Sequence, residues 1–461
     1  ITLIELFAWY KQMQQYHLNQ ITDRNRRMFL KLLGVRPFSA RPARAAVALA
    51  PSMKGRRLCE GTIFHSEGGV PFELEEALDG SAVHMEEAYF ERQGELHEIT
   101  ALLQGGEVPI SLRGREEGEA LYLGFSGAQE REELRLWIEI AQDYPVARNP
   151  FAKDSPLPRA IAFETMHGAE RRELEIVLDE TAALSHSGKL VLRCPGGVPV
   201  TDGGKGLPQR CYVVLSIPEA GCEEAPALLS VTADFAEITQ RTTCSEVHEF
   251  TLQEGEQGDF SLRTRLAVEG DVDVFVRDGK GWLRLEQFQS VLQGEELPLR
   301  RVSFQPPSLK ADGQPNVRIV CYLRSFKEAM RQDAAGLPGQ TLRLFNYGEE
   351  PDVSRLKVMC LSCTGRDDWR YLDWRYTDCL EGAGPMDPVY TCDGEEGVLR
   401  FGDNVEGAAP EQGREAIYVA AFSLTKGEDG ALPLGQNLYC AGLRPWRELM
   451  LPPYGSDEER R

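Results

Sequence analysis

The cysteine pair Cys360 and Cys363 has the spacing of one half of a zinc site, because two thiolates three positions apart can reach one metal ion. A second such pair is missing: Cys379 and Cys392 lie 13 residues apart, and no histidine occurs from residue 249 to the end. Within a strand, Cys360 and Cys363 would also point to opposite faces. We therefore expect no metal at this pair, and neither a metal nor an organic cofactor elsewhere.

Two other patterns fall short of a reactive site. The segment 124–127, Gly-Phe-Ser-Gly, is one residue shorter than the elbow that exposes a nucleophilic serine, and no helix is expected after it. Asp271 and Asp273 begin like a calcium loop, but Phe275 and Val276 stand where a ligand and a glycine are needed. The seven histidines form no pair at helical or hairpin spacing, and no Gly-rich phosphate loop occurs. The sequence thus predicts no catalytic residue and a protein that is not an enzyme.

Composition restricts the possible partners and compartments. Lys and Arg total 51 against 72 Asp and Glu, so the net charge of -21 disfavours binding to a phosphate backbone. No run approaches the ~20 apolar residues of a membrane span, so we expect no membrane insertion. Eleven cysteines without framework spacing favour free thiols and a cytoplasmic location. Residues 1–20 lack the features of a signal peptide, and residue 1 is not Met, so we expect the chain to begin inside a longer polypeptide.

The sequence predicts a helical segment over residues 1–34, the first of the elements that could position a site. Thr2 and Glu5 have the spacing of a capping box. A second helix is predicted over about 23–33, with Gly34 as its left-handed stop. One apolar stripe follows the first helix at helical spacing and consists of Leu3, Leu6, Phe7, Tyr10 and Met13.

The rest of the chain is typical of β-structure. Short strands with period-two alternation are separated by Gly, Asp, Asn and Pro turns, and only 326–335 resembles another helix. A weak repeat relates 258–285 to 339–372, and duplication and a common β-pattern explain it equally well. We expect an α+β chain that is predominantly β, with a helical N-terminal segment and several β-sandwich or β-barrel modules.

Both ends of the chain resemble one family. The opening Ile1–Trp9, with the segment 23–35, resembles the N-terminal helices of baseplate J-like proteins of contractile phage tails and extracellular contractile injection systems. The segment 61–78 is similar to the family's early hairpin, and 417–436 to its strand and Gly-rich turn. The segment 397–410 is similar to the family's Phe-Gly-Asp-Gly motif through Gly402, Asp403, Asn404 and Gly407, with Asn404 where Gly is frequent.

This resemblance implies a structural baseplate wedge component that assembles in the cytoplasm with other wedge subunits, and indirectly with sheath and tube. The stripe on the first helix would then be a partner interface, although it could also pack on the chain's own β-structure. Because the family's hairpin and Gly-rich strand lie close in sequence, we expect one discontinuous domain that brings Phe72 and Leu74 close to Phe401 and Val419. The expected domains are 1–36, 37–100 plus 396–440, 101–255, 256–395 and a tail over 441–461.

An alternative from another class is a carbohydrate-binding or glycan-processing protein, because inserted β-sandwiches can bind sugars on aromatic platforms. Such a platform would use Trp137, Trp282, Trp369 and Trp374, although tryptophan in strands is more often part of the core.

Overall fold

The structure is a computed structural model that divides the chain into two compact units, residues 1–40 and residues 41–461, which are described separately. As expected, strands predominate and a helix lies near the N-terminus. The described residues are 2–19, 26, 29–30, 41–48, 57–79, 83–106, 108–112, 118–130, 132–141, 161–168, 170–217, 226–233, 235–253, 255–294, 298–307, 309, 312–344, 350–366, 368–394, 397–432 and 438–440.

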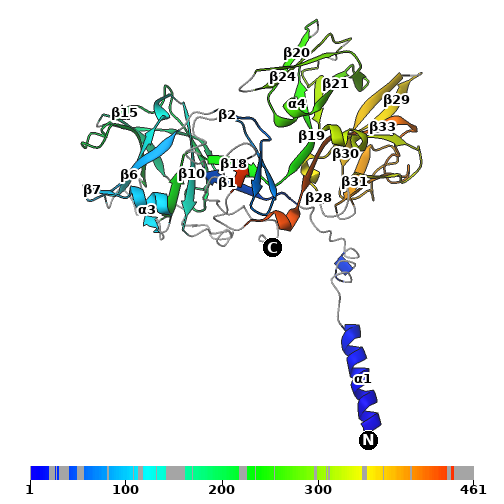
Figure 1. Ribbon diagram of the computed structural model, residues 1–461, viewed down its shortest axis with the longest axis horizontal. Helices are drawn as coiled ribbons and strands as arrows, with labels where there is room; N and C mark the ends of the chain where they lie inside the picture. Colours follow the sequence, from blue (N-terminus) through cyan, green and yellow to red (C-terminus); the bar gives the residue numbers. More distant parts are fainter. Residues whose placement is uncertain are drawn as a thin grey trace. The chain divides into compact units, whose positions relative to one another are not determined.

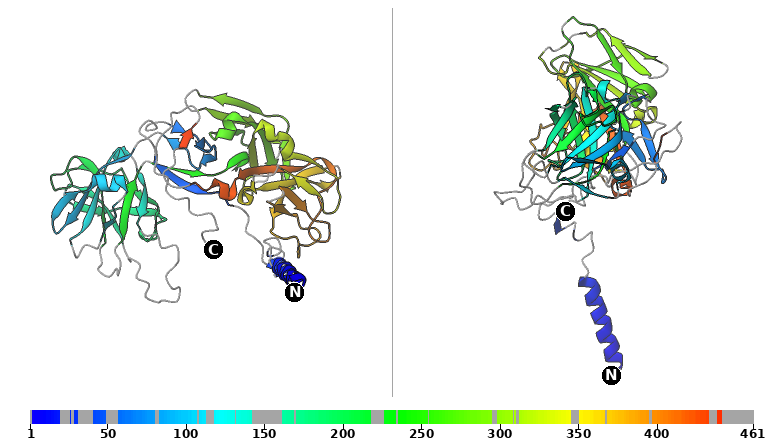
Figure 2. Two further views of the ribbon diagram at one scale, coloured as in Figure 1. Left: turned by 60° about the horizontal axis from the view of Figure 1, so that its bottom comes forward. Right: turned by 90° about the vertical axis from the view of Figure 1, so that its left-hand side faces the viewer.

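The first unit contains helix α1, which runs from Thr2 to Asn19 with Glu5 in its first turn. Figures 1 and 2 show it as one straight helix. The capping box of Thr2 and Glu5 remains a prediction. Of the second predicted helix only Arg26, Phe29 and Leu30 are described, and they are helical. Gly34 lies outside the described residues.

The second unit begins with a small module that is discontinuous in sequence. Its five-stranded sheet has the order β1-β18-β4-β3-β34, so strands from the start, middle and end of the chain lie side by side. The core between them contains Val47, Phe64, Phe72, Ile238 and Leu438. The strands are β1 (Arg44–Ala48), β3 (Ile63–Ser66), β4 (Pro71–Leu74), β18 (Phe235–Thr239) and β34 (Leu438–Cys440), with the separate pair β2 (Arg57–Leu58) and β5 (Leu78–Asp79).

The second module, residues 84–232, is a sandwich of two antiparallel sheets. Alternate residues of the facing strands form its core, for example Leu123 and Val213 on one sheet and Leu136 and Leu190 on the other. One sheet contains β6 (His84–Arg92), β7 (Glu95–Glu98), β9 (Ala120–Ser126), β11 (Ala162–His167), β12 (Glu170–Glu173), β15 (Val200–Thr201) and β16 (Arg210–Ser216). The other contains β8 (Ile110–Ser111), β10 (Glu133–Ile140), β13 (Glu175–Asp179), β14 (Gly188–Arg193) and β17 (Ala227–Thr232), and helices α3 (Thr100–Gly105) and η3 (Ala128–Glu130) lie between strands in sequence.

The third module, residues 242–425, is built on a twelve-stranded sheet. The order β22-β21-β25-β19-β33-β29-β30 closes on itself, because Trp282 on β22 pairs with Tyr371 on β30. The module has two hydrophobic cores. One is formed largely by strands of the ring, and the other lies between the ring and a separate three-stranded sheet. The ring strands are β19 (Thr242–Phe250), β21 (Asp271–Arg277), β22 (Trp282–Leu285), β25 (Val317–Tyr322), β29 (Lys357–Gly365), β30 (Asp368–Tyr376) and β33 (Gly413–Thr425).

The remaining elements of the third module extend this ring. The large sheet continues through β26 (Arg331–Ala334), β27 (Thr341–Arg343), β28 (Glu350–Pro351), β31 (Val389–Asp393) and β32 (Val398–Phe401), and the small sheet contains β20 (Gly258–Leu262), β23 (Gln289–Gln293) and β24 (Leu299–Phe304). The helices of the module are α4 (Arg265–Glu269), η4 (Arg324–Phe326), α5 (Lys327–Met330) and η5 (Val353–Arg355), and η6 (Gly427–Gly430) follows it in the chain.

These strand pairings correct the expected domain boundaries. The early hairpin module is discontinuous, but 438–440 closes it, whereas 398–425 belongs to the third module. Phe72 and Leu74 lie in one hydrophobic cluster, and Phe401 and Val419 lie in another, so the predicted contact is wrong. The physical reason is that β33 pairs over its length with β19, β26 and β29 of its own module.

The helix expected over 326–335 is shorter than predicted. Only η4 and α5 are helical, and the chain becomes strand β26 at Arg331. The reason is tertiary: β26 pairs with β33, and the Arg331 guanidinium bonds Asp273 and the Tyr322 hydroxyl. The tail over 441–461 lies outside the described residues.

Candidate functional site: a buried ionic junction

The carboxylate of Glu73 is the centre of a buried ionic junction. Glu73 is 1% exposed and lies on β4 of the first module. Its oxygen Oε1 accepts from Thr243 N at 2.7 Å and from Arg265 Nη2 at 2.9 Å. Its oxygen Oε2 accepts from Arg241 Nε at 3.2 Å and from the Thr243 hydroxyl at 2.5 Å. Both oxygens are therefore fully hydrogen-bonded, as a buried carboxylate requires.

The two arginines have further partners that hold them in place. Arg265 Nε donates to the Gly61 carbonyl at 2.8 Å. Arg241 contacts the Glu75 carboxylate at 3.4 Å, and Thr239 also donates to Glu75. Burial raises the pKa of Glu75, but the Thr239 hydrogen bond and the nearby arginines outweigh it, and the net pKa is lowered.

Local structure explains why these groups meet. Arg241 lies two residues after the end of β18, which pairs with β4 in the first module. Thr243 lies on the next strand, β19, in the third module. Arg265 opens α4, where the Thr264 side chain caps the helix by accepting from Ala267 N. The junction therefore connects the two modules through the short segment 240–243. Gln240 adds to it by bonding the Pro71 carbonyl, the Thr425 hydroxyl and Lys426 N.

A small hollow lies beside the junction. Besides Glu73 and the two arginines, Glu60, Glu246 and Arg355 line it. Burial and the neighbouring Glu246 raise the pKa of Glu60. The hollow thus combines carboxylates and guanidinium groups in similar number, an arrangement that neutralises charge within the chain.

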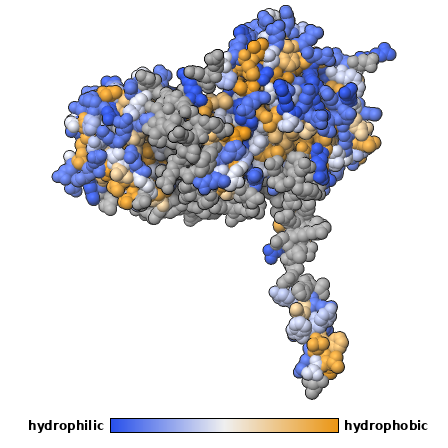
Figure 3. All heavy atoms as spheres, in the orientation of Figure 1, coloured by the Kyte–Doolittle hydropathy of each residue, from blue (hydrophilic) through white to orange (hydrophobic). Residues whose placement is uncertain are grey.

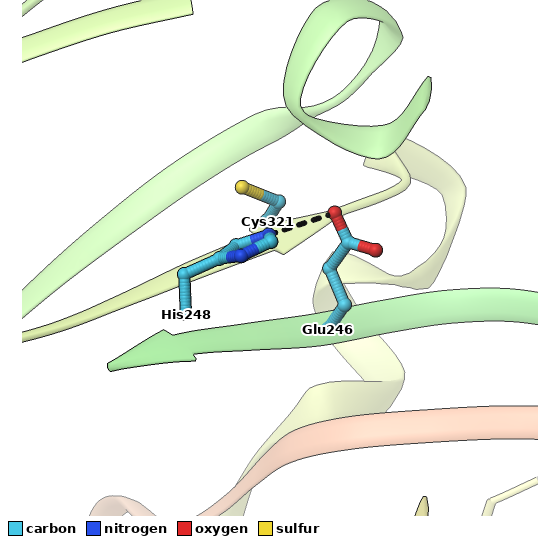
Figure 4. Close-up of side chains that lie close together, drawn as sticks. All are labelled: Glu246, His248 and Cys321. Carbon is cyan, nitrogen blue, oxygen red and sulfur yellow. Dashed lines mark hydrogen bonds and ion pairs between the residues drawn. The ribbon is translucent and has the colours of Figure 1, made fainter. Parts of the chain in front are cut away.

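Glu246, which lines this hollow, also belongs to a second cluster with His248 and Cys321 (Figure 4). Antiparallel pairing places Glu246 on β19 opposite Cys321 on β25, and His248 lies two residues further along β19 on the same face. His248 Nε2 lies 3.1 Å from Glu246 Oε1, and one donor atom of each residue lies within 4.8 Å of the others. Burial, together with Glu246, raises the pKa of the Cys321 thiol well above its usual value.

Sequence analysis missed both groupings. Cys321 and His248 are 73 residues apart, and only strand pairing brings them together. The glutamates of the junction are among 72 acidic residues, so no sequence signal distinguishes Glu73 from the rest. The Glu246-x-His248 spacing within a strand pattern was the available signal, since i and i+2 share a face.

The other predicted residues are distributed over the molecule. Cys360 is buried and Cys363 is exposed on β29, as expected for opposite strand faces. In the turn similar to the family motif, Asn404 and Gly407 are left-handed with φ of 66° and 84°. Asp403 accepts from Val405 N and Glu406 N, and these backbone bonds lower its pKa. Gly402 has no room for a side chain, because a Cβ there would lie 2.2 Å from the Gly407 carbonyl carbon.

The tryptophans do not form the platform of the carbohydrate-binding alternative. Trp137, Trp282 and Trp374 are buried, and of the four only Trp369 is exposed. Trp137 packs edge-on against Phe235, and Trp374 against Phe401, so they contribute to cores.

All five predicted interface residues are exposed on α1. Figure 3 shows hydrophobic side chains on this helix. Ile4, Trp9 and Tyr16 are exposed on it as well. The predicted five are exposed by 42–70%: Leu3, Leu6, Phe7, Tyr10 and Met13.

Comparison with known proteins adds little. No protein-family model matches the chain, and no curated protein is significantly similar to it. Among solved structures it is similar to a chain of the TssK-TssF-TssG baseplate subcomplex of a type VI secretion system, solved by cryo-electron microscopy. That match has 11% identity and a TM-score of 0.28, and covers 70% of this chain and 67% of the other. No helix in the described ranges has the length and hydropathy of a membrane span.

Proposed function

We propose that this chain is a non-enzymatic, structural subunit of the baseplate of a contractile tail or injection system, assembled in the cytoplasm. It would join neighbouring wedge subunits through the apolar stripe of α1, and through them sheath and tube. The proposal is supported by the ordered resemblance of residues 1–78 and 397–436 to baseplate J-like proteins. The observation that carries it is the row of large apolar side chains exposed along α1.

The exposed stripe is a physical reason to expect a partner. At 100° per residue, Leu3, Leu6, Phe7, Tyr10 and Met13 occupy an arc of about 120°, as in helices that pack against another surface. In proteins, most of the stability of a helix comes from packing of an apolar face rather than from the intrinsic propensity of its residues. Contiguous apolar patches of this kind usually mark contact sites.

Covering this stripe with a partner would contribute favourably to assembly. Each large apolar side chain contributes about 1.5–3 kcal/mol when it is fully buried. Two of them, Leu6 and Phe7, would therefore contribute about 3–6 kcal/mol, which corresponds to a change in affinity of about a hundredfold or more.

The experiment places two charges on the stripe and compares them with two charges on the opposite face. Leu6→Asp with Phe7→Asp should prevent entry into baseplates or sheathed particles in the producing cell. Gln12→Asp with Gln15→Asp adds the same charge on the side of the helix opposite the stripe, and it should enter at normal levels. Both variants should keep the wild-type thermal unfolding of the β-modules.

Two outcomes would contradict the interface. If the Leu6→Asp/Phe7→Asp variant enters particles normally, α1 only braces its own chain. If that variant loses the folded β-modules, the stripe belongs to the core of the chain itself.

A further inference from the structure

The cluster of Glu246, His248 and Cys321 has the geometry of a metal site. All three side chains project from the same face of two hydrogen-bonded strands. Ligands on adjacent strands are fixed more precisely than ligands on loops. Zinc binds His nitrogen, carboxylate oxygen and thiolate at about 2.0–2.3 Å, so tetrahedral ligands lie roughly 3–4 Å apart. The 3.1 Å between His248 and Glu246 matches that separation, and the other donors lie within 4.8 Å.

A second observation concerns the thiol. Cys321 is fully buried, and its sulfur makes no hydrogen bond with any residue in the described part of the chain. A buried cysteine often serves as a small hydrophobe. Cys321 lies in a hydrophobic cluster, but it also stands directly opposite Glu246 and close to the His248 imidazole.

The carboxylate is also held in position by an outer partner. The Thr264 hydroxyl, at the start of α4, donates to Glu246 Oε1. The second oxygen, Oε2, accepts no hydrogen bond from the described residues. Supporting bonds of this kind orient ligands in known metal sites.

We propose that Glu246, His248 and Cys321 bind one divalent transition-metal ion, and that zinc fits the donor set best. An imidazole, a thiolate and a carboxylate together suit a borderline-soft ion and disfavour calcium or magnesium, which take oxygen ligands. The fourth position would be open to water or to the Glu60 carboxylate, which lines the same hollow as Glu246. A cation there would offset the repulsion between these two carboxylates.

A metal ion at this cluster differs from the sequence-based expectation of no metal, and it does not depend on the proposed function. The ion would connect β19 and β25 beside α4, close to the ionic junction.

The test is titration of the reduced full chain with Zn²⁺ in the presence of excess Mg²⁺, which occupies surface carboxylates. Calorimetry should show one site, with about one proton released because the Cys321 thiol must ionise on binding. Cys321→Ala and His248→Asn should each lower the affinity by more than the ~10–100-fold that loss of an outer partner costs.

Two controls make the result specific. Cys360→Ala removes an equally buried thiol from β29 and should leave the affinity unchanged, as should Cys363→Ser, which removes the exposed thiol. Because Cys321→Ala empties part of a core, His248→Asn provides the decisive variant if the former does not fold. Co²⁺ should give a thiolate charge-transfer band with wild type that both cluster variants lack.

Absence of saturable Zn²⁺ binding to wild type would overturn the proposal. So would a site whose affinity stays within a few-fold of wild type in a folded His248→Asn variant, or one that disappears with Cys363→Ser.

Discussion

Two buried ionic groups of the second unit show opposite arrangements. At the junction, one carboxylate, Glu73, lies between two guanidinium groups, Arg241 and Arg265. In the third module, one guanidinium, Arg318, lies between two carboxylates, Glu249 and Asp373, and over the Trp282 ring at 4.1 Å.

The two groups differ in how far their partners reach water. The arginines beside Glu73 have side chains that are 4% and 10% exposed, whereas the Asp373 side chain is 56% exposed. When the central charge is removed from a cluster that is shielded from water, its partners remain buried and unpaired. Partners that reach water can instead be solvated. The comparison indicates that the junction depends far more on its central residue than the Arg318 group does.

The largest effect should come from Glu73→Ala. We expect a loss of about 3–5 kcal/mol in the free energy of unfolding, because two buried guanidinium groups lose their shared partner. Denaturant unfolding followed by circular dichroism measures it. Glu76→Ala, which removes an exposed carboxylate on the same segment, is the control and should cost about 0–1 kcal/mol. A Glu73→Ala loss no larger than that of Glu76→Ala would show that the junction relaxes or admits water.

A smaller effect is expected for Arg318→Met. The change keeps much of the buried volume and leaves Glu249 and Asp373 with access to water. Loss of the charged hydrogen bonds should cost about 1–3 kcal/mol in the same unfolding measurement. If Arg318→Met destabilised the protein as much as Glu73→Ala, the difference in solvent access would not be the deciding factor.

The smallest effect should be on the loss of stability at low pH. The Asp373 carboxylate is only partly exposed, and its loss of hydration raises its pKa, but hydrogen bonds from Arg318 and Trp282 outweigh this effect, so the folded-state pKa is lowered. Its stabilising contribution is therefore present above the pKa of the unfolded chain and is lost as the pH falls through the lower folded-state pKa. Asp373→Asn should flatten the decline of stability below about pH 4, where an ordinary Asp titrates. An unchanged decline would mean that other carboxylates determine it.

The sequence predicted the class of fold because local patterns carry that information. Alternating strands, Gly-rich turns and the stripe of α1 are all local patterns. Which strands pair is decided by contacts between distant segments. The pairing of β33 with its own module, rather than with the early hairpin, has no local signal.

The same limit applies to the candidate site. Glu73 and Glu246 differ from other acidic residues only in what surrounds them after folding. His248 and Cys321 become neighbours through the register of β19 and β25. A sequence shows that such residues exist, whereas their grouping depends on a register that period-two alternation leaves open.

The strand order of the first module has a consequence for synthesis of the protein. Strands β3 and β4 leave the ribosome early, but their neighbour β34 lies about 360 residues after β4. At ~5–20 residues per second, β3 would wait roughly 20–70 s for its partner. During that time its edge could pair with another chain. The second and third modules, whose strands are nearly contiguous in sequence, can fold during this interval, so the first module would be completed last.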